Sequence, residues 1–304
     1  MRFGGHESFA IRDGWLHKGL RLLVEEPERL DDEHVADWLG VGRNMAKSIC
    51  HWLMATGLGE AASDRTAKNR PHMVPTPFGR LVYDQDRYFT APGTLWMLHV
   101  NLIHNAGYAA SWDWFFNRYS PTRFERSVCL ESLLRYLRVS QTRIPSLRTL
   151  ERDIGCLLST YARSIPGRRM DPEDMGESPF VELGLMTYYR SSGYYQVNQG
   201  VKAIPPEVFG YTMAMAFSET PDYGSTIDIT LHDASRRSGA PGRVFMMTGE
   251  ALFESVLMIE ASHPHVLQLA GLAGDRVIRM RQQSADAWAQ AYYEAETPAV
   301  LYAV

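Results

Sequence analysis

The sequence has few cysteines and no long hydrophobic run, and each shortage excludes a class of protein. Its three cysteines, Cys50, Cys129 and Cys156, lie far apart, which argues against a disulfide framework or a paired-cysteine zinc site. No apolar stretch approaches the ~20 residues that cross a bilayer, and the first residues lack the apolar core of a signal peptide. We therefore expect reduced thiols in a cytoplasmic protein with no membrane partner.

Lysine is also scarce, and the common signatures of nucleases and nucleotide-hydrolysing enzymes are missing. Only four residues are lysine, and none stands in a D…ExK arrangement. HNH-like patterns, P-loops and GxSxG motifs are absent as well. The composition, with 45% hydrophobic and 22% charged residues in a chain of 304, is that of a globular protein of about two domains.

The formal net charge of −4 conceals a strong asymmetry along the chain. Residues 118–169 contain eleven arginines and four acidic residues, whereas residues 170–304 contain eight basic and seventeen acidic residues. An arginine stripe of this kind suits bidentate contacts to phosphate groups, so the middle of the chain can bind nucleic acid although the whole molecule is acidic. In the alternative interpretation, these arginines pair with the acidic C-terminal part on a solvated surface.

Residues 14–58 have the pattern of a helix-turn-helix. Apolar side chains at helical spacing predict a first helix over 14–26, and a second helix starts near residue 31 and ends at the turn around Gly40. The helix that starts near residue 43 is the predicted recognition helix, which enters the major groove of DNA. Its predicted DNA contacts are Arg43 at the start and, on one outward face, Asn44, Lys47, Ser48 and His51.

A polar segment with basic residues follows this helix and predicts a β-hairpin, the wing of a winged helix. Its cations Arg65, Lys68 and Arg70 would lie along the adjacent DNA backbone or in the minor groove. Helix-turn-helix modules also mediate contacts between proteins, and that is the alternative function of this part.

Two further helices, predicted over 124–137 and 144–162, resemble a second helix-turn-helix. Ser146 and Thr149 are placed to cap the second of them. Arg148 and Arg152 lie one turn apart, off its apolar stripe, and we predict that they contact DNA together with Arg143, just before this helix. A plain helical hairpin that carries arginines would produce the same pattern.

The periodicity stops over residues 164–179, where proline, glycine and alternating charges predict a domain boundary. We predict an N-terminal motif with a winged helix-turn-helix over 1–90, a helical core with the second helix-turn-helix-like unit over 91–170, and an acidic α+β domain over 171–304. The predicted fold class is mainly α, with a tandem winged helix-turn-helix N-terminal part and a smaller α+β C-terminal domain.

The opening motif FGGHESF, residues 3–9, supports two interpretations. As chemistry, His6 is a general base or acid, Glu7 holds a divalent ion, and Arg12 stabilises the charge that develops on a phosphodiester. As structure, Glu7 and Ser8 cap the first helix, Arg12 pairs with Glu7, and His6 is hydrogen-bonded against the winged helix. Both interpretations stay open on the sequence alone.

The same motif, followed by Arg12 and Gly14-Trp15-Leu16, resembles bacterial proteins whose domain of unknown function begins FGGHE[ST]F. The resemblance continues through VPTPFGRLVYD, PGTLWMLH, SLRTLERDIGCLL and SPFVELGL, so it spans about residues 1–185, and the C-terminal third matches only in outline. The genes of this family lie in DNA phosphorothioation defence clusters beside a cysteine desulfurase, an ATPase and a sulfurylating ATP pyrophosphatase. The resemblance implies winged-helix character and strand nicking that precedes sulfur insertion, as in the DNA-nicking component of the single-strand system.

The helix-turn-helix pattern and the arginine stripe predict a protein that binds double-stranded DNA, and the resemblance implies that it nicks this DNA for phosphorothioation. Mg²⁺ or Mn²⁺ is the predicted cofactor, and the predicted protein partners are the cysteine desulfurase, the ATPase and the ATP pyrophosphatase. Asp228 and Asp233 form a second candidate metal pair, with a solvated loop edge as the alternative. Two other functions compete with nicking: a non-catalytic winged-helix adaptor that recruits the modification enzymes, and a protein-interaction scaffold.

Overall fold

The computed structural model describes residues 2–30, 32–65, 71–140, 144–165, 178–217, 222–272 and 275–296. The chain divides into two compact units, Met1–Gln199 and Gly200–Val304. Both units consist mainly of α-helices, accompanied by small, largely antiparallel sheets, in agreement with a mainly α fold class. Within the described residues, no helix is both long and apolar enough to span a membrane.

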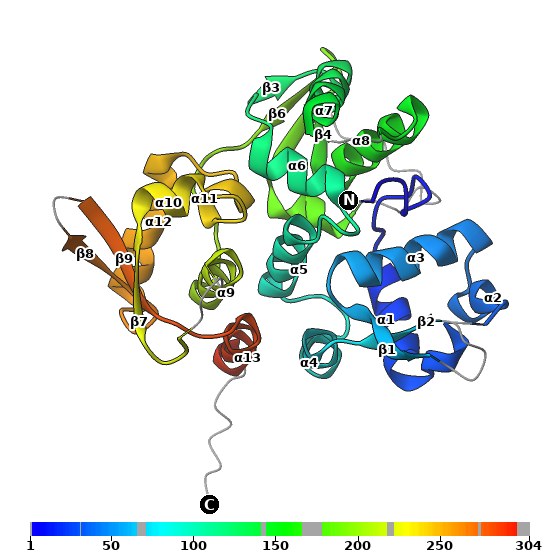
Figure 1. The fold of residues 1–304 in the computed structure, drawn as a ribbon, viewed down its shortest axis with the longest axis horizontal. Coiled ribbons are helices and arrows are strands. Elements are labelled where there is room, and N and C mark those ends of the chain that lie inside the picture. The colour runs from blue at the N-terminus through cyan, green and yellow to red at the C-terminus, as the bar shows by residue number, and fades with distance from the viewer. Residues whose placement is uncertain are drawn as a thin grey trace, which may run out of the picture. The chain divides into compact units, whose positions relative to one another are not determined.

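The first half of unit 1 consists of three helices followed by a hairpin and a fourth helix (Figure 1). Its elements are α1 (Trp15–Glu25), the 3₁₀ helix η1 (Pro27–Arg29), α2 (Val35–Leu39), α3 (Arg43–Ala55), β1 (Gly59–Arg65), β2 (Pro71–Pro75) and α4 (Pro77–Asp86). The predicted first and third helices are confirmed to within about a residue. Gly40 ends α2 in the left-handed conformation that glycine adopts without strain, with φ of 65°, and so permits the turn into α3.

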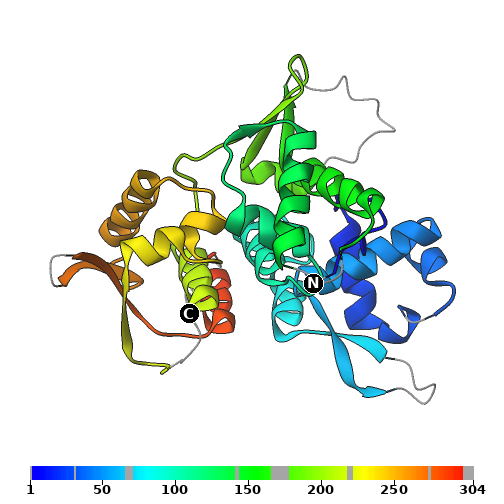
Figure 2. The same cartoon turned by 45° about the horizontal axis from the view of Figure 1, so that its top comes forward.

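The core of this half lies where α1 packs against α3. Leu20 and Leu23 from α1 meet Ile49, Trp52 and Leu53 from α3, all of them essentially inaccessible to solvent. The hairpin is antiparallel, with Gly59 opposite Pro75, and it extends away from the helices in Figure 2, where it is light blue. The predicted hairpin is thus confirmed.

The second half of unit 1 combines four helices with a four-stranded sheet. Its elements are α5 (Pro92–His104), α6 (Ala110–Arg118), β3 (Arg123–Phe124), α7 (Arg126–Ser140), α8 (Leu147–Tyr161), β4 (Ala162–Ile165), the 3₁₀ helix η3 (Pro179–Leu183), β5 (Met186–Tyr189) and β6 (Tyr194–Val197). The strand order is β3-β6-β5-β4, with β4 parallel to β5 and the other pairs antiparallel. The β5–β6 hairpin, yellow-green in Figure 2, turns at Gly193, which has φ of 72°.

The boundary between the units differs from the predicted one. The structure places it between Gln199 and Gly200, about twenty residues after the predicted boundary at 164–179. The reason is strand pairing, because β5 and β6 join β3 and β4 in one sheet and so hold residues 178–199 in unit 1. The predicted parts 1–90 and 91–170 accordingly belong to a single compact unit.

Unit 2 consists of helices and a three-stranded antiparallel sheet of order β7-β9-β8. Its elements are α9 (Pro206–Ala216), β7 (Thr226–Thr230), α10 (Leu231–Arg236), α11 (Pro241–Val244), α12 (Gly249–Ser262), β8 (Leu267–Leu272), β9 (Asp275–Arg281) and α13 (Ala285–Glu296). α9 packs against α13, where the ring of Trp288 fills the space beside Gly210. The α+β character predicted for the C-terminal part is confirmed for this unit.

Candidate nucleic-acid interface

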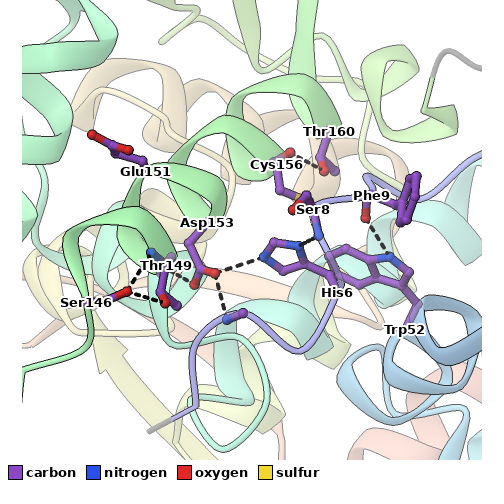
Figure 3. A network of polar contacts seen from close by, with 12 residues as sticks. His6, Ser8, Phe9, Trp52, Ser146, Thr149, Glu151, Asp153, Cys156 and Thr160 are labelled. Carbon is purple, nitrogen blue, oxygen red and sulfur yellow. Dashed lines mark hydrogen bonds and ion pairs between the residues drawn. The ribbon is translucent and has the colours of Figure 1, made fainter. Parts of the chain in front are cut away.

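The N-terminal motif is fastened to α8 by one buried carboxylate, that of Asp153 (Figure 3). The backbone N–H of Gly4 donates to Oδ1 of Asp153 at 2.7 Å, and Nε2 of His6 donates to the same oxygen at 3.0 Å. The hydroxyl of Ser111, from α6, donates to Oδ2 at 2.8 Å. Three donors therefore satisfy a carboxylate that is only 2% exposed, as a buried charge requires.

The ring of His6 is fixed by hydrogen bonds at both nitrogens and by stacking on an aromatic ring. Its Nδ1 accepts a hydrogen bond from the backbone N–H of Ser8 at 3.1 Å, so its proton lies on Nε2. The ring stacks on Trp52 of α3, with centroids 5.7 Å apart and planes 14° apart. His6 thus joins α3 to Asp153 of α8, and we call this cluster of His6, Trp52, Ser111 and Asp153 the buried joint.

These contacts favour the structural interpretation of His6. Its exposed fraction is 2%, and both ring nitrogens are engaged, so it is out of reach of a phosphodiester in this structure. The predicted hydrogen-bonded, structural histidine accounts for these contacts, and the predicted general base or acid does not.

Glu7 and Arg12 occupy different surroundings from those predicted. Glu7 and Ser8 are exposed, with left-handed φ angles of 50° and 75°. They do not cap α1, which begins after Gly14 and has no side-chain cap. Arg12 does not pair with Glu7 among the described ion pairs; its guanidinium lies over the rings of Phe9 and Trp15, at 5.7 and 5.5 Å. Two consecutive non-glycine residues with positive φ are costly, which indicates that the buried joint imposes this turn.

The outward face predicted for α3 is partly covered. Arg43, Asn44 and Lys47 are exposed as expected, but Ser48 and His51 are buried, at 0% and 7%. The prediction of a fully exposed face was therefore wrong for these two residues. For His51 the physical reason is the N-terminal motif, whose Gly5 lies against the histidine ring.

The covering of His51 depends on a glycine in the motif. A Cβ atom on Gly5 would lie 2.4 Å from Nδ1 of His51, so only glycine allows the backbone to approach the ring this closely. Burial, with smaller electrostatic contributions from the neighbouring His6 and Arg2, lowers the pKa of His51 to about 3. His51 is therefore a neutral imidazole at physiological pH.

The polar face of helix α8 is exposed to solvent. Ser146 caps its first turn by accepting a hydrogen bond from the backbone N–H of Thr149 at 3.2 Å, as predicted. Arg148 and Arg152 are exposed, and neither forms an ion pair with a described residue. The apolar stripe of this helix is buried from Leu150 onward. Two cations one turn apart, without an ion-pair partner in the described part of the chain, thus project from a capped, firmly packed helix.

Four other described arginines of the basic stripe have partners in unit 1, whereas Arg135 and Arg138 of α7 are exposed and form no ion pair with a described residue. Arg126 donates to the carbonyl oxygen of Glu151 at 2.7 Å, and Arg163 pairs with Glu182 at 3.3 Å. Arg118 and Arg123 lie over the rings of Tyr136 and Tyr194, respectively. Within the described part of the chain, pairing with carboxylates from the acidic C-terminal sequence is limited to Arg163.

Some predicted contacts cannot be located. Lys68, Arg70 and Arg143 lie outside the described residues. Arg65 ends β1, and the structure describes its backbone but not its side chain.

No metal site accompanies these features in the described ranges. They contain no group of three or more histidine, cysteine, aspartate or glutamate residues placed to hold an ion. The candidate pair in unit 2 has other contacts: Asp228 forms a bidentate ion pair with Arg279 at 2.8 Å, and Asp233 takes part in the Thr230 cap of α10. The donor set of the described residues does not fit a resident divalent ion held by protein ligands alone.

Asp153 is the residue of the buried joint that no motif pointed to. It lies three residues after Leu150 and four before Leu157, so it belongs to the buried stripe of α8. Carboxylates are almost never fully buried unless they are paired. An aspartate on an apolar stripe was therefore the available signal that a distant donor, here His6, must meet it.

The whole sequence was compared with known families and structures. The family described as "Protein of unknown function (DUF4007)" matches residues 3–293. The chain belongs to this family. The "SspB crystal structure" is similar at 27% identity and a TM-score of 0.82, and the "Magnesium ion-bound SspB crystal structure" at 26% identity and the same TM-score. Each comparison covers 97% of this chain and 87% of the other. No curated protein matches the chain.

Proposed function

We propose that unit 1 is a tandem winged-helix unit that binds double-stranded DNA. The order α1-α2-α3-β1-β2 is that of a winged helix, with α3 in the place of the recognition helix. The order α6-β3-α7-α8-β5-β6 repeats this plan, since β3 pairs with β6 and β6 with β5, and α8 then occupies the recognition position. The parallel strand β4 is an addition at the edge of the second sheet.

The observation that carries the proposal is the free pair of arginines on α8. Arg148 and Arg152 are exposed, unpaired among the described residues, and one turn apart on the helix in the recognition position. Guanidinium groups that have no carboxylate partner are available to phosphate oxygens, which they bind bidentately. On α3, Arg43, Asn44 and Lys47 stay available for the same duplex, whereas Ser48 and His51 are buried.

The proposed role is strand nicking in DNA phosphorothioation, with the cysteine desulfurase, the ATPase and the ATP pyrophosphatase as partner proteins. Family membership and the likeness to SspB structures support this role. Mg²⁺ or Mn²⁺ belongs to the proposal because one similar structure is magnesium-bound SspB. We assign no ligands and no catalytic step to the ion. Glu7 and Arg12 stay in the proposal as reaction residues, and His6 is assigned to positioning.

A plasmid assay separates nicking from the adaptor function. Supercoiled plasmid is incubated with the full chain and Mg²⁺ or Mn²⁺, with and without a chelator, and with the three partner proteins added in a second series. Relaxed circles that disappear with the chelator support the proposed nicking. Plasmid that is shifted in a gel but stays supercoiled in both series contradicts it and favours the adaptor. A Glu7→Gln variant should lose nicking and keep DNA affinity if Glu7 takes part in the reaction.

A further inference from the structure

A groove of about 560 Å³ lies in unit 1 between the N-terminal motif, α3 and the β1–β2 hairpin. We call it the N-terminal groove. Its polar lining is contributed by Arg2 and Glu7 from the N-terminal segment, Lys47 and His51 from α3, His72 from β2, and Tyr108. It is therefore a concave, polar site whose size is that of common small-molecule sites, roughly 300–1,000 Å³.

The charge of the groove favours an anion. Arg2 and Lys47 are exposed, and neither forms an ion pair with a described residue. The guanidinium of Arg2 lies over the ring of Tyr108, at 5.7 Å from its centre. Glu7 is the one acidic residue among the described lining residues. Two free cations and a single carboxylate leave the groove with a net positive charge.

Two histidines in the groove have nitrogen atoms without partners. His51, only 7% exposed, makes no hydrogen bond to a described residue, and its buried Nδ1 lies against the backbone of Gly5. Nδ1 of His72 is also buried and unpaired within the described ranges. Buried polar atoms are nearly always hydrogen-bonded, so the unpaired Nδ1 of His72 beside the groove points to a ligand. A neutral imidazole carries one N–H, which is a donor suited to an anionic oxygen.

We propose that the N-terminal groove binds a nucleotide of a DNA strand, with its phosphate between Arg2 and Lys47 and beside the ring of His51. A phosphate group fits because it is anionic and accepts several hydrogen bonds from different directions. The volume exceeds what a phosphate alone needs, and the ring of Tyr108 offers a surface on which a base stacks. The choice of DNA rests on the proposed function, whereas the phosphate site rests on the groove itself.

Calorimetric titration of the full chain with deoxyadenosine 5′-monophosphate, in the absence of DNA, tests the site. Each of Arg2→Ala and Lys47→Ala should weaken binding about tenfold, the effect of one charge-assisted contact. Lys18→Ala, which removes an exposed lysine of α1 outside the groove, should leave binding unchanged. Equal losses in all three variants, or no binding by the wild type, would overturn the proposal.

Nuclear magnetic resonance of the wild-type chain gives a second readout that no folding defect can obscure. Addition of the nucleotide should shift the ring nitrogen signals of His51 and leave those of the exposed His232 in place. Inorganic phosphate should bind more weakly than the nucleotide; equal affinity for both would overturn the nucleotide assignment.

Failure of this site and failure of the proposed function are distinguishable. Arg148→Ala with Arg152→Ala should reduce duplex binding without affecting the nucleotide titration. If the wild-type chain binds the nucleotide but no duplex, the proposed function is contradicted and the nucleotide site in the groove is still supported.

Discussion

In the proposed tandem winged-helix arrangement, helices α3 and α8 both occupy the recognition position, yet their polar faces have different surroundings. On α3, Ser48 and His51 are buried, His51 against Gly5 of the N-terminal motif, whereas Arg148 and Arg152 of α8 are exposed. The two helices meet in the buried joint, which uses Trp52 from α3 and Asp153 from α8. The contrast teaches that a helix in the recognition position can serve as a support, so exposure of its side chains, and not its topological place, identifies the contact surface.

The largest effect is expected from breaking the joint between the two helices. Asp153→Ala leaves the N–H groups of Gly4 and His6 and the hydroxyl of Ser111 without their acceptor, each at a cost of about 1–3 kcal/mol. We expect the free energy of unfolding to fall by about 3–5 kcal/mol, measured by denaturant titration. Glu151→Ala is the matched control, because this exposed carboxylate lies on the same helix, and its effect should stay within about 0.5 kcal/mol. Similar losses of stability in both variants would contradict the stabilising role of the buried joint.

The next largest effect concerns His51 of α3, whose burial makes the stability of the chain depend on pH. The pKa of His51 is lowered from 6.5 to about 3 by burial, so the folded chain keeps this ring neutral while the unfolded chain protonates it below about pH 6.5. Because the unfolded state binds the extra proton, stability falls as pH decreases through this window, by at most about 1.4 kcal/mol per pH unit.

A His51→Gln variant tests this linkage. Between pH 6 and 4, the unfolding free energy of this variant should change less steeply with pH than that of the wild type. The difference in slope corresponds to at most one bound proton, or about 1.4 kcal/mol per pH unit. His232→Gln, which removes an exposed histidine of unit 2, is the control and should keep the wild-type dependence. An unchanged slope in His51→Gln would mean that the ring is hydrated and α3 uncovered in solution.

The smallest stability effects concern how each helix begins. Ser146 caps α8 with its side chain, so Ser146→Ala should destabilise the chain by about 1 kcal/mol. Helix α3 starts after Gly42, which has an extended backbone, open space for a Cβ and no side-chain cap. Gly42→Ser should therefore stabilise the chain by a few tenths of a kcal/mol. Thermal melting of both variants measures the two shifts; shifts of the same sign would contradict the assigned caps.

Local structure in this chain was predictable, and its long-range pairing was not. Apolar spacing predicted α1, α3 and α8 closely, because each buries one stripe against a neighbour. The cap at Ser146 also followed from local sequence. The bond from His6 to Asp153 joins positions 147 residues apart, and no local pattern contains it. For the same reason, the covering of His51 by Gly5 and the extension of unit 1 to residue 199 required the tertiary structure.

The central claim, that α8 holds DNA through its free arginines, is tested most directly by the salt dependence of duplex binding. Each phosphate contact contributes about 0.9 to the slope of log affinity against log salt concentration. The double variant Arg148→Ala, Arg152→Ala should therefore lower the slope by about 1.8. The control Arg236→Ala, Arg281→Ala removes the same charge from exposed positions of unit 2 and should keep the wild-type slope. A slope that is unchanged in the α8 variant, with folding intact, would contradict the account.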